Sequence, residues 1–276
     1  MANILYITFD GITDPLGRSQ ILPYLIGLRQ RGHTIHILSQ EKQDQLKNDK
    51  ASVDQTLEKH GIYWDYIVYK NKPAIIQPLI QRRKIKKMAF EIIANKPVKL
   101  THCRSYMAGA VGLEIKRKHG IPFVFDMRGF WADERKEGGL WPYSNPIYRA
   151  VYKSVKRLER KLLQNADHII SLTHKGKNII EGWNHIRDFG ESISVIPCCA
   201  DLKHFDPSRY SSNDRETLRK SYHLAHEDVV IGYVGSIGTW YMLDEMLDAF
   251  AVWHKHIPNL KLFFLSKLST RRKASN

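Results

Sequence analysis

Cysteine is scarce in this chain of 276 residues, and the three that occur are Cys103, Cys198 and Cys199. Their number and spacing provide neither a disulfide framework nor the paired ligands of a zinc site. We therefore expect reduced thiols, as in a cytoplasmic protein, and no bound metal ion.

Long apolar runs are absent as well, so the sequence indicates no membrane-spanning helix. The first residues lack the basic segment of a secretory signal and pass at once into an apolar run from Ile4 to Phe9. Both observations favour a cytoplasmic location.

Acidic residues are outnumbered, because 28 Asp and Glu stand against 43 Lys and Arg, with a formal net charge of +15. This balance attracts polyanions such as nucleic acid, an anionic membrane face or phosphorylated substrates. Basic residues cluster in 82–87 and again between Arg149 and Lys161. Two interpretations stay open for these clusters, a solvated helix face or a peripheral contact with the inner face of the membrane. No nucleic-acid-binding motif accompanies the charge, so a charge-driven nucleic-acid binder is the weaker alternative.

Strand and helix signals alternate along the first two hundred residues. This order predicts an α/β fold with a doubly wound, parallel, Rossmann-like sheet covered by helices on both faces. A segment rich in Gly and Trp, 127–145, is expected to form a long irregular loop. The expected strands are 4–9, 34–38, 62–69, 98–102, 122–126, 168–172 and 193–196, and the best-marked helices are 73–95, 106–119, 146–165 and 175–184.

The alternation starts again after a polar segment. Residues 229–235 predict a strand that ends in a glycine turn, 240–256 a helix, and 260–265 a second strand. We therefore predict a first domain over 1–205, a linker or hinge over 206–228, and the beginning of a second Rossmann-like domain over 229–276 with an irregular basic tail.

Ligands of open parallel sheets bind beyond the carboxyl ends of the strands. The glycines of the first loop would let a phosphate or sugar approach the backbone, or they form a plain turn. A histidine at a strand end hydrogen-bonds a sugar hydroxyl or is satisfied within the protein. The positions selected by this rule are Gly11, Gly17 and Arg18 after the first strand, His102, Arg104 and Ser105 after the fourth, and Asp126, Arg128 and Gly129 after the fifth.

Four stretches, in this order and spacing, resemble family 4 (group 1) glycosyltransferases of the GT-B fold. The first is 9–20 followed by the helix end Arg31-Gly32-His33, and the second is 102–105 with 120–126. The third, 195–207, is similar to the family's hinge, and the fourth, 232–235, to the first strand of its donor-binding domain.

The resemblance implies a retaining transfer of a sugar from a nucleotide-sugar to a glycan or lipid-linked acceptor, as in polysaccharide biosynthesis. It implies no metal and no cofactor other than the nucleotide-sugar, which is a substrate. The N-terminal domain is expected to bind the acceptor and the C-terminal domain the nucleotide. We accordingly expect acceptor-binding roles for Gly17, Arg18, His102 and Arg104, catalytic roles for Asp126 and Arg128, and donor-binding roles for Gly235 and Ser236.

The sequence departs from the family pattern at several positions. Arg128 stands where the family carries His, and since Arg cannot act as a base, we expect it to clamp a phosphate or carboxylate, oriented by Asp126. Cys198 and Cys199 replace Asn-Gly at the hinge, and Ser236 replaces Arg.

The family's Glu-x7-Glu element of the donor site would lie beyond residue 276. The resemblance therefore implies a truncated chain. We expect such a chain to be impaired or inactive alone, unless a partner chain completes the donor domain. The alternative is a non-catalytic remnant that binds the acceptor or the membrane.

Overall fold

The computed structural model describes residues 1–70, 77–237 and 241–266. The chain forms two compact units, 1–199 and 200–276, and each is described by itself. Parts of three predicted segments lie outside the described residues: 73–76 of a helix, Trp240 at the start of another, and the basic tail from residue 267 onward.

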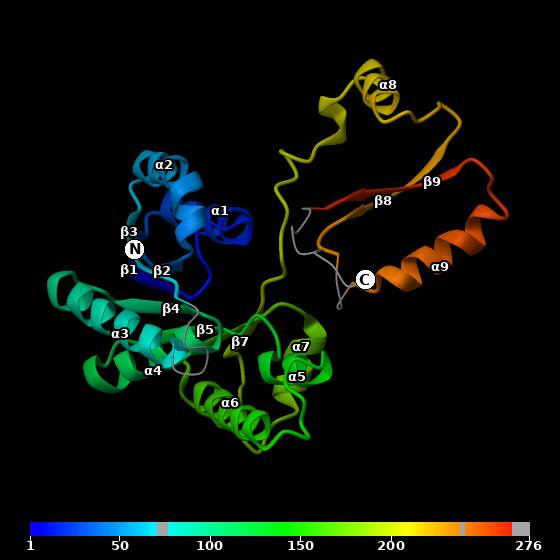
Figure 1. The fold of residues 1–276 in the computed structure, drawn as a ribbon. Helices are drawn as coiled ribbons and strands as arrows, with labels where there is room; N and C mark the ends of the chain where they lie inside the picture. Colours follow the sequence, from blue (N-terminus) through cyan, green and yellow to red (C-terminus); the bar gives the residue numbers. More distant parts are fainter. Residues whose placement is uncertain (71–76, 238–240, 267–276) are drawn as a thin grey trace. The chain divides into compact units, whose positions relative to one another are not determined.

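The first unit contains a seven-stranded sheet whose strands all pair in parallel, in the order β3-β2-β1-β4-β5-β6-β7 (Figure 1). The doubly wound arrangement expected from the sequence is confirmed. The strands are β1 Asn3–Thr8, β2 Thr34–Glu41, β3 Tyr63–Val68, β4 Leu100–Arg104, β5 Phe123–Asp126, β6 His168–Ser171 and β7 Ile193–Val195.

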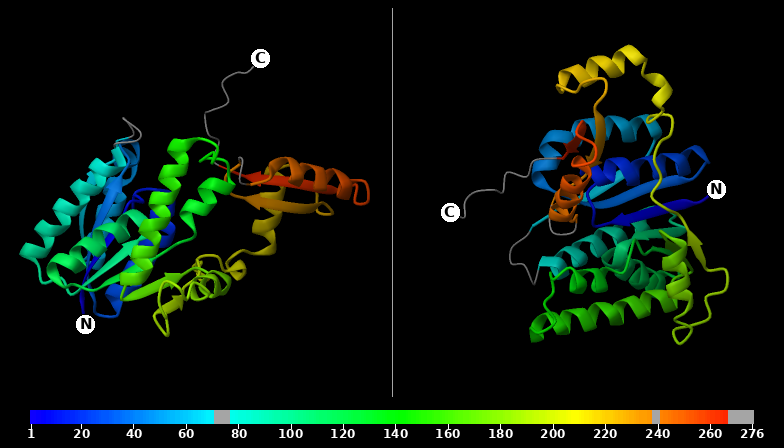
Figure 2. Two further views of the ribbon diagram at one scale, coloured as in Figure 1. Left: turned by 90° about the horizontal axis from the view of Figure 1, so that it is seen from below. Right: turned by 90° about the vertical axis from the view of Figure 1, so that its right-hand side faces the viewer.

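Helices cover both faces of this sheet, and β1 shows why. Its side chains alternate between two cores, since Ile4 and Tyr6 belong to one cluster while Leu5 and Ile7 belong to the other. Helices α1 (Leu22–Gln30) and α2 (Gln43–His60) pack on the first cluster. Helices α3 (Gln77–Asn95), α4 (Ser105–His119) and α6 (Pro146–Asn165) pack side by side on the second (Figure 2).

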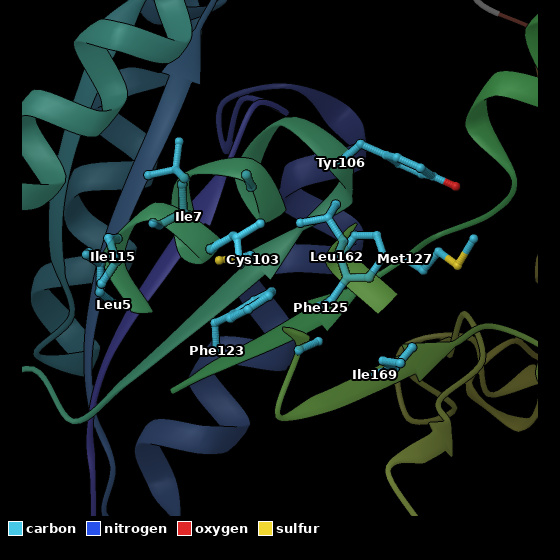
Figure 3. Packing of buried hydrophobic residues seen from close by; sticks show 14 of the residues in the cluster. Leu5, Ile7, Cys103, Tyr106, Ile115, Phe123, Phe125, Met127, Leu162 and Ile169 are labelled. Atoms are coloured by element: carbon cyan, nitrogen blue, oxygen red, sulfur yellow. The ribbon is translucent and has the colours of Figure 1, made fainter. Parts of the chain in front are cut away.

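Helix α4 approaches the sheet closely because small residues face it. A Cβ at Gly112 would lie 2.4 Å from the Sγ of Cys103 on β4, and one at Gly109 would lie 2.9 Å from Leu162 of α6. Figure 3 shows Cys103 enclosed among the apolar side chains of this core. Burial raises the pKa of the Cys103 thiol to about 12, so this residue is a packing element rather than a nucleophile.

The segment 127–145 is not a continuous irregular loop, which corrects the expectation from the sequence. Residues Trp131–Glu137 form helix α5. Acidic side chains lie in its first turn and basic side chains in its last, an order that complements the helix dipole. Trp131 packs edge-on against Trp141 and also contacts Tyr106, so these two tryptophans pack within the protein, whereas Tyr143 of the same segment is exposed.

Helix α6 begins and ends where the sequence predicts. The side chain of Asn145 accepts a hydrogen bond from the Ile147 N–H, and Pro146 occupies the first helical position. The sheet of this unit ends with helix α7 (His174–Glu181) followed by β7.

The second unit holds one β-α-β motif, with β8 (Val229–Val234) and β9 (Leu260–Leu265) in parallel and α9 (Leu243–His254) between them. The predicted linker is not without structure. It contains helix α8 (Ser212–Ser221), which begins with a capping box formed by Ser211 and Asp214. Among the described residues of this unit, only Leu260 has a buried apolar side chain.

A buried histidine on β2 predicts how stability depends on pH. His36 is 6% exposed, its Nε2 lies 2.6 Å from Asp65 Oδ2 on β3, and Lys96 Nζ lies 3.2 Å from its Nδ1. Burial lowers the pKa of His36 and Lys96 lowers it further, whereas the hydrogen bond that Asp65 accepts from the imidazole raises it. The unfolded chain therefore takes up the proton first as the pH falls.

We expect the free energy of unfolding to decrease as the pH drops below about 6.5, by about 1.4 kcal/mol for each unit that separates the two pKa values. Urea unfolding between pH 8 and pH 5 measures this slope. His36→Gln should flatten it, whereas the exposed His185→Gln should leave it unchanged. An unaltered slope in His36→Gln would show that other groups cause the pH dependence.

Candidate functional site

The candidate site lies where the strand order of the first sheet reverses. Strands β1 and β4 are neighbours there, and the chain leaves them toward opposite sides of the sheet. Ligands of doubly wound sheets bind in the crevice outside the carboxyl ends of the strands at this switch point. The residues placed at this edge are Asp10 after β1, Arg104 at the end of β4, Asp126 at the end of β5, and Arg128.

Arg104 is the buried centre of this group, with 4% of its surface exposed. Its Nε donates to Asp10 Oδ2 at 2.9 Å, and its Nη1 lies 3.8 Å from Asp126 Oδ2. Burial lowers the pKa of the guanidinium, but its interactions with Tyr6, Asp10 and Asp126 together raise it more. Arg104 is the last residue of β4 rather than part of the following loop, because the sheet ladder continues through the pairs Thr8–Arg104 and Arg104–Asp126.

Gln20 joins the two arginines of the site. Its Oε1 accepts hydrogen bonds from Arg104 Nη2 at 3.3 Å and from Arg128 Nη2 at 2.9 Å. Gln20 lies in a π-helical turn, Gly17–Ile21, which leads into α1. One amide oxygen thus holds two positive charges side by side, and the Asp126 carboxylate lies within 3.8 Å of both guanidinium groups.

The backbone is strained at two positions of this edge. Arg128 has φ +59° and Ser105 has φ +69°, and both are in the left-handed region that favours glycine. Such a conformation costs an L-residue about 1–2 kcal/mol, and non-glycine examples gather at functional sites. Arg128 also donates to the Sγ of Cys198 at 3.4 Å, a contact within the first unit.

His102 and Asp126 form a buried polar pair beside the arginines. His102 Nε2 lies 3.7 Å from Asp126 Oδ2, too far for a hydrogen bond. Among the described residues, His102 Nε2 and Asp126 Oδ1 are buried and have no hydrogen-bond partner. Buried polar atoms nearly always have a hydrogen-bond partner. The lack of one at these two atoms fits groups that hydrogen-bond a ligand hydroxyl or water.

Two tyrosines enclose the imidazole of His102. The ring centroids of Tyr6 and Tyr24 lie 4.8 Å and 5.6 Å from that of His102. Burial raises the pKa of both tyrosines, and the Asp126 carboxylate raises it further. Both hydroxyls therefore keep their protons at neutral pH and remain hydrogen-bond donors.

Gly17 and Arg18, expected to bind the acceptor, have clear structural neighbours. A Cβ at Gly17 would lie 2.0 Å from the carbonyl oxygen of Gly11, so only glycine allows the two ends of the first loop to approach. Arg18 Nη1 pairs with Asp49 Oδ1 of α2 at 2.7 Å on the surface. The structure therefore does not bring the Arg18 guanidinium together with the four polar residues at the strand ends, and its predicted role stays a prediction.

The predicted donor residues Gly235 and Ser236 follow the carboxyl end of β8 in the second unit. Gly235 N donates to Leu265 O at 3.1 Å, which extends the ladder with β9. The Tyr233 hydroxyl donates to Ser236 O at 2.7 Å. Their role in donor binding also stays a prediction.

No group of three or more His, Cys, Asp or Glu side chains in the described ranges is arranged to hold a metal ion. Every helix in those same ranges is too short or too polar to cross a lipid bilayer.

Sequence comparison decides the family. Residues 24–204 match the family model described as Glycosyltransferase Family 4. The chain belongs to this family. The match covers β2 to β7 and includes His102, Arg104, Asp126 and Arg128, and it confirms the resemblance carried by the motifs. No curated protein compared with the chain matches its sequence.

Solved structures similar to this glycosyltransferase family member include HepE (Alr3699) of Anabaena in complex with UDP and glucose, with a TM-score of 0.62, 16% identity and 96% of this chain covered. Sucrose-phosphate synthase of Thermosynechococcus elongatus gives 0.61, 14% and 98%. UDP-GlcNAc 2-epimerase of Neisseria meningitidis, bound to UDP-GlcNAc, gives 0.55, 12% and 98%. At these identities the similarity shows the fold, which is GT-B. The chain spans 60%, 64% and 66% of the lengths of these three proteins.

The sequence alone did not reveal several residues of the site. Tyr6 and Tyr24 belong to no motif selected from the sequence, and Asp10 and Gln20 lie in the family-like stretch 9–20 without an assigned role in the site. Asp10 directly follows the first strand, and the rule that selected Arg104 and Asp126 also applies to it. Nothing in the sequence indicated that Gln20 bridges two arginines, because its two partners lie 84 and 108 residues away in the sequence.

Proposed function

We propose that this protein acts in retaining transfer of a sugar from a nucleotide-sugar to an anionic acceptor, such as a diphosphate-linked lipid glycan of polysaccharide biosynthesis. Membership of Glycosyltransferase Family 4 supports glycosyl transfer, and the bound UDP and glucose of the HepE structure support a nucleotide-sugar donor. The chain spans only part of the length of these similar proteins. Sugar transfer by the chain is therefore proposed here and does not follow from the similarity alone.

The paired guanidinium groups of Arg104 and Arg128 carry the proposal for the acceptor. Guanidinium groups bind phosphate oxygens through parallel N–H donors, and Gln20 holds these two in a fixed relative orientation. Neither arginine can accept a proton, so their contribution is electrostatic. They would bind the diphosphate of the acceptor, next to the point where its sugar begins.

His102 and Asp126 supply the complementary polar contacts in this proposal. Their buried, unpaired atoms lie on the same face of the sheet as the arginines and would hydrogen-bond hydroxyl groups of the acceptor sugar. The neutral Tyr6 and Tyr24 rings would exclude water from these contacts, which strengthens them.

A basic stripe on α6 supports a location at an anionic membrane surface. Four of its five residues recur every four positions and the fifth, Arg160, lies beside them, so they share one helix face, and all five are exposed. The apolar side chain of Ile147 is 58% exposed at the start of the same helix. Each basic residue near an anionic leaflet contributes about 1 kcal/mol. The stripe consists of Arg149, Lys153, Arg157, Arg160 and Lys161.

The acceptor proposal is tested by binding and by transfer. Isothermal titration with inorganic pyrophosphate and with geranyl diphosphate should show binding to the parent chain, and Arg128→Gln should weaken it at least tenfold. Arg135→Gln, which removes an exposed charge of α5, should bind as the parent does. Sugar transfer is the second test. It is measured from labelled UDP-sugars to a diphosphate-linked lipid acceptor, with and without a co-expressed partner chain that could complete the donor domain. Equal binding by both variants would refute the clamp, and absence of transfer in every combination would refute the activity.

The membrane proposal predicts salt-sensitive flotation with vesicles that contain about one-third anionic phospholipid. The triple variant Arg149→Glu, Lys153→Glu, Arg157→Glu should lose most of its bound fraction, as should the parent chain at high salt. A variant of equal net charge, Lys47→Glu, Lys59→Glu, Lys99→Glu, should stay bound. Equal loss in both triple variants would mean that overall charge, rather than the α6 stripe, directs binding.

A further inference from the structure

A cavity lies at the amino ends of the strands of the first sheet, where β1, β2 and β3 begin. Its volume is about 360 Å³. Apolar groups of Ile4, Tyr63, Pro97 and Val98 form much of its wall. The amino ends of parallel strands are far from the carboxyl-end site, so this cavity is separate from the site of the proposed transfer.

A chain of three polar groups closes one side of the cavity. Lys96 Nζ lies 3.2 Å from His36 Nδ1, and His36 Nε2 lies 2.6 Å from Asp65 Oδ2. An ammonium group can only donate, so Nδ1 accepts and Nε2 carries the proton that is donated to Asp65. The lowered pKa of His36 agrees with this neutral form. The imidazole is buried and fully satisfied, which fixes the position of Lys96.

The charge within the cavity is therefore positive. Among the described residues that line it, Lys96 is the one that carries a full charge, since Asp65 contacts His36 from outside the lining. The Lys96 ammonium also lies 4.0 Å from the centre of the Tyr63 ring. The ammonium is thus held against an aromatic wall, and it has three N–H donors of which His36 takes one.

We infer that this cavity binds a small monoanion with an apolar body, of the class of aromatic or medium-chain carboxylates, through Lys96. The cavity volume lies in the range of small-molecule sites, and its walls are predominantly apolar with few convergent polar groups, as in such sites generally. A single ammonium matches one negative charge, whereas a nucleotide or sugar phosphate would bring two or more charges and a polar body.

Benzoate and hexanoate are the probes, titrated into the whole chain and followed by chemical shifts of the Tyr63 ring and of the backbone amide of Val98. We expect saturable binding of both carboxylates and at least tenfold weaker binding of the neutral isostere benzamide. Lys96→Met keeps an unbranched side chain, one atom shorter and without the charge, and should weaken benzoate binding at least tenfold. Lys99→Met removes an exposed positive charge three residues away and should have no effect.

A second variant tests the inference independently, in case Lys96→Met does not fold. Val98→Glu keeps Lys96 and His36 but adds a negative charge to the wall, and it too should abolish benzoate binding. Circular dichroism verifies that each variant is folded. Failure of both carboxylates to bind, equal binding of benzamide, or unchanged binding in folded Lys96→Met would each overturn the inference.

Discussion

Replacing Arg128 by glycine is expected to lower acceptor-dependent sugar transfer about 100-fold or more while the free energy of unfolding changes by no more than about 1 kcal/mol. The functional loss follows from the removal of one of two guanidinium groups that converge on the acceptor site. A hydrogen bond to a charged group contributes about 1.5–3 kcal/mol, so losing the guanidinium from the bound acceptor diphosphate should reduce acceptor binding and transfer by a factor of this order.

Stability should be nearly unchanged because two effects oppose each other. Arg128 has φ +59°, which costs an L-residue about 1–2 kcal/mol and costs glycine almost nothing. The variant gives up the hydrogen bond to Gln20 and the pairing with Asp126 at 3.7 Å, contacts of the order of 1 kcal/mol together at this partly exposed position. A residue that lowers stability through its backbone and serves function through its side chain produces this pattern.

Arg128→Ala is the informative comparison. It removes the same guanidinium but keeps the left-handed strain, so it should be less stable than Arg128→Gly by about 1 kcal/mol. Both variants should lose transfer and pyrophosphate binding to the same extent. Urea unfolding and initial rates measure the two quantities. If Arg128→Ala were more stable than Arg128→Gly, the proposed backbone strain at this position would be refuted. If both variants retained sugar transfer, the proposed binding of the acceptor diphosphate by Arg128 would be refuted.

The fold was predictable because its signals are local. Strands β1 and β5 are short apolar runs, and β1 reads Ile4-Leu5-Tyr6-Ile7 because both of its faces are buried. The strand-end rule then led to His102, Arg104, Asp126 and Arg128, which the structure does bring together. Side chains at the ends of neighbouring parallel strands lie close together because strand pairing fixes their positions, independently of the conformation of the loops.

The parts that were not predicted depend on contacts between distant segments. Gln20 lies on a turn that resembles any helix start, and its role appears only when β4 and the loop after β5 fold beside it. The short helix α5 was missed since glycine and tryptophan in 127–145 suggested irregular structure. There the packing of Trp131 on Tyr106 and Trp141 outweighs local preference.

Glu41 is a further residue that the sequence did not reveal, and its replacement by alanine should have the largest effect on stability. It is the last residue of β2 and is fully buried. Its carboxylate accepts hydrogen bonds from the backbone N–H groups of Ile12 and Thr13 at 2.8 Å and 3.1 Å, and from the hydroxyls of Thr13 and Ser39. The carboxylate thereby fixes the loop that follows β1.

The loop is shaped around this carboxylate. A Cβ at Gly11 would lie 2.7 Å from Glu41 Oε2, so glycine at this position gives the carboxylate its space. The same loop continues through Gly17 into the turn that positions Gln20 and therefore the two arginines. Stability of the loop and geometry of the site are coupled through one buried side chain.

Glu41→Ala should lower the free energy of unfolding by about 3 kcal/mol or more, because it leaves two buried backbone N–H groups without an acceptor and opens a void. Each unsatisfied buried donor costs about 1–3 kcal/mol. Urea unfolding of the first unit measures the loss, and amide hydrogen exchange at Ile12 and Thr13 should become much faster. The exposed Glu58→Ala should change stability by less than about 0.5 kcal/mol.

Glu41→Gln separates the charge from the shape of the side chain. It keeps the size but turns one oxygen into an NH₂ group that faces N–H and O–H donors, so it should also be destabilising, though less than alanine. If the loop positions Gln20 as the contacts indicate, both variants should weaken pyrophosphate binding in proportion to the exchange rates at Ile12 and Thr13. Unchanged pyrophosphate binding in a variant whose loop amides exchange rapidly would show that Gln20 and the arginines hold their geometry without this loop.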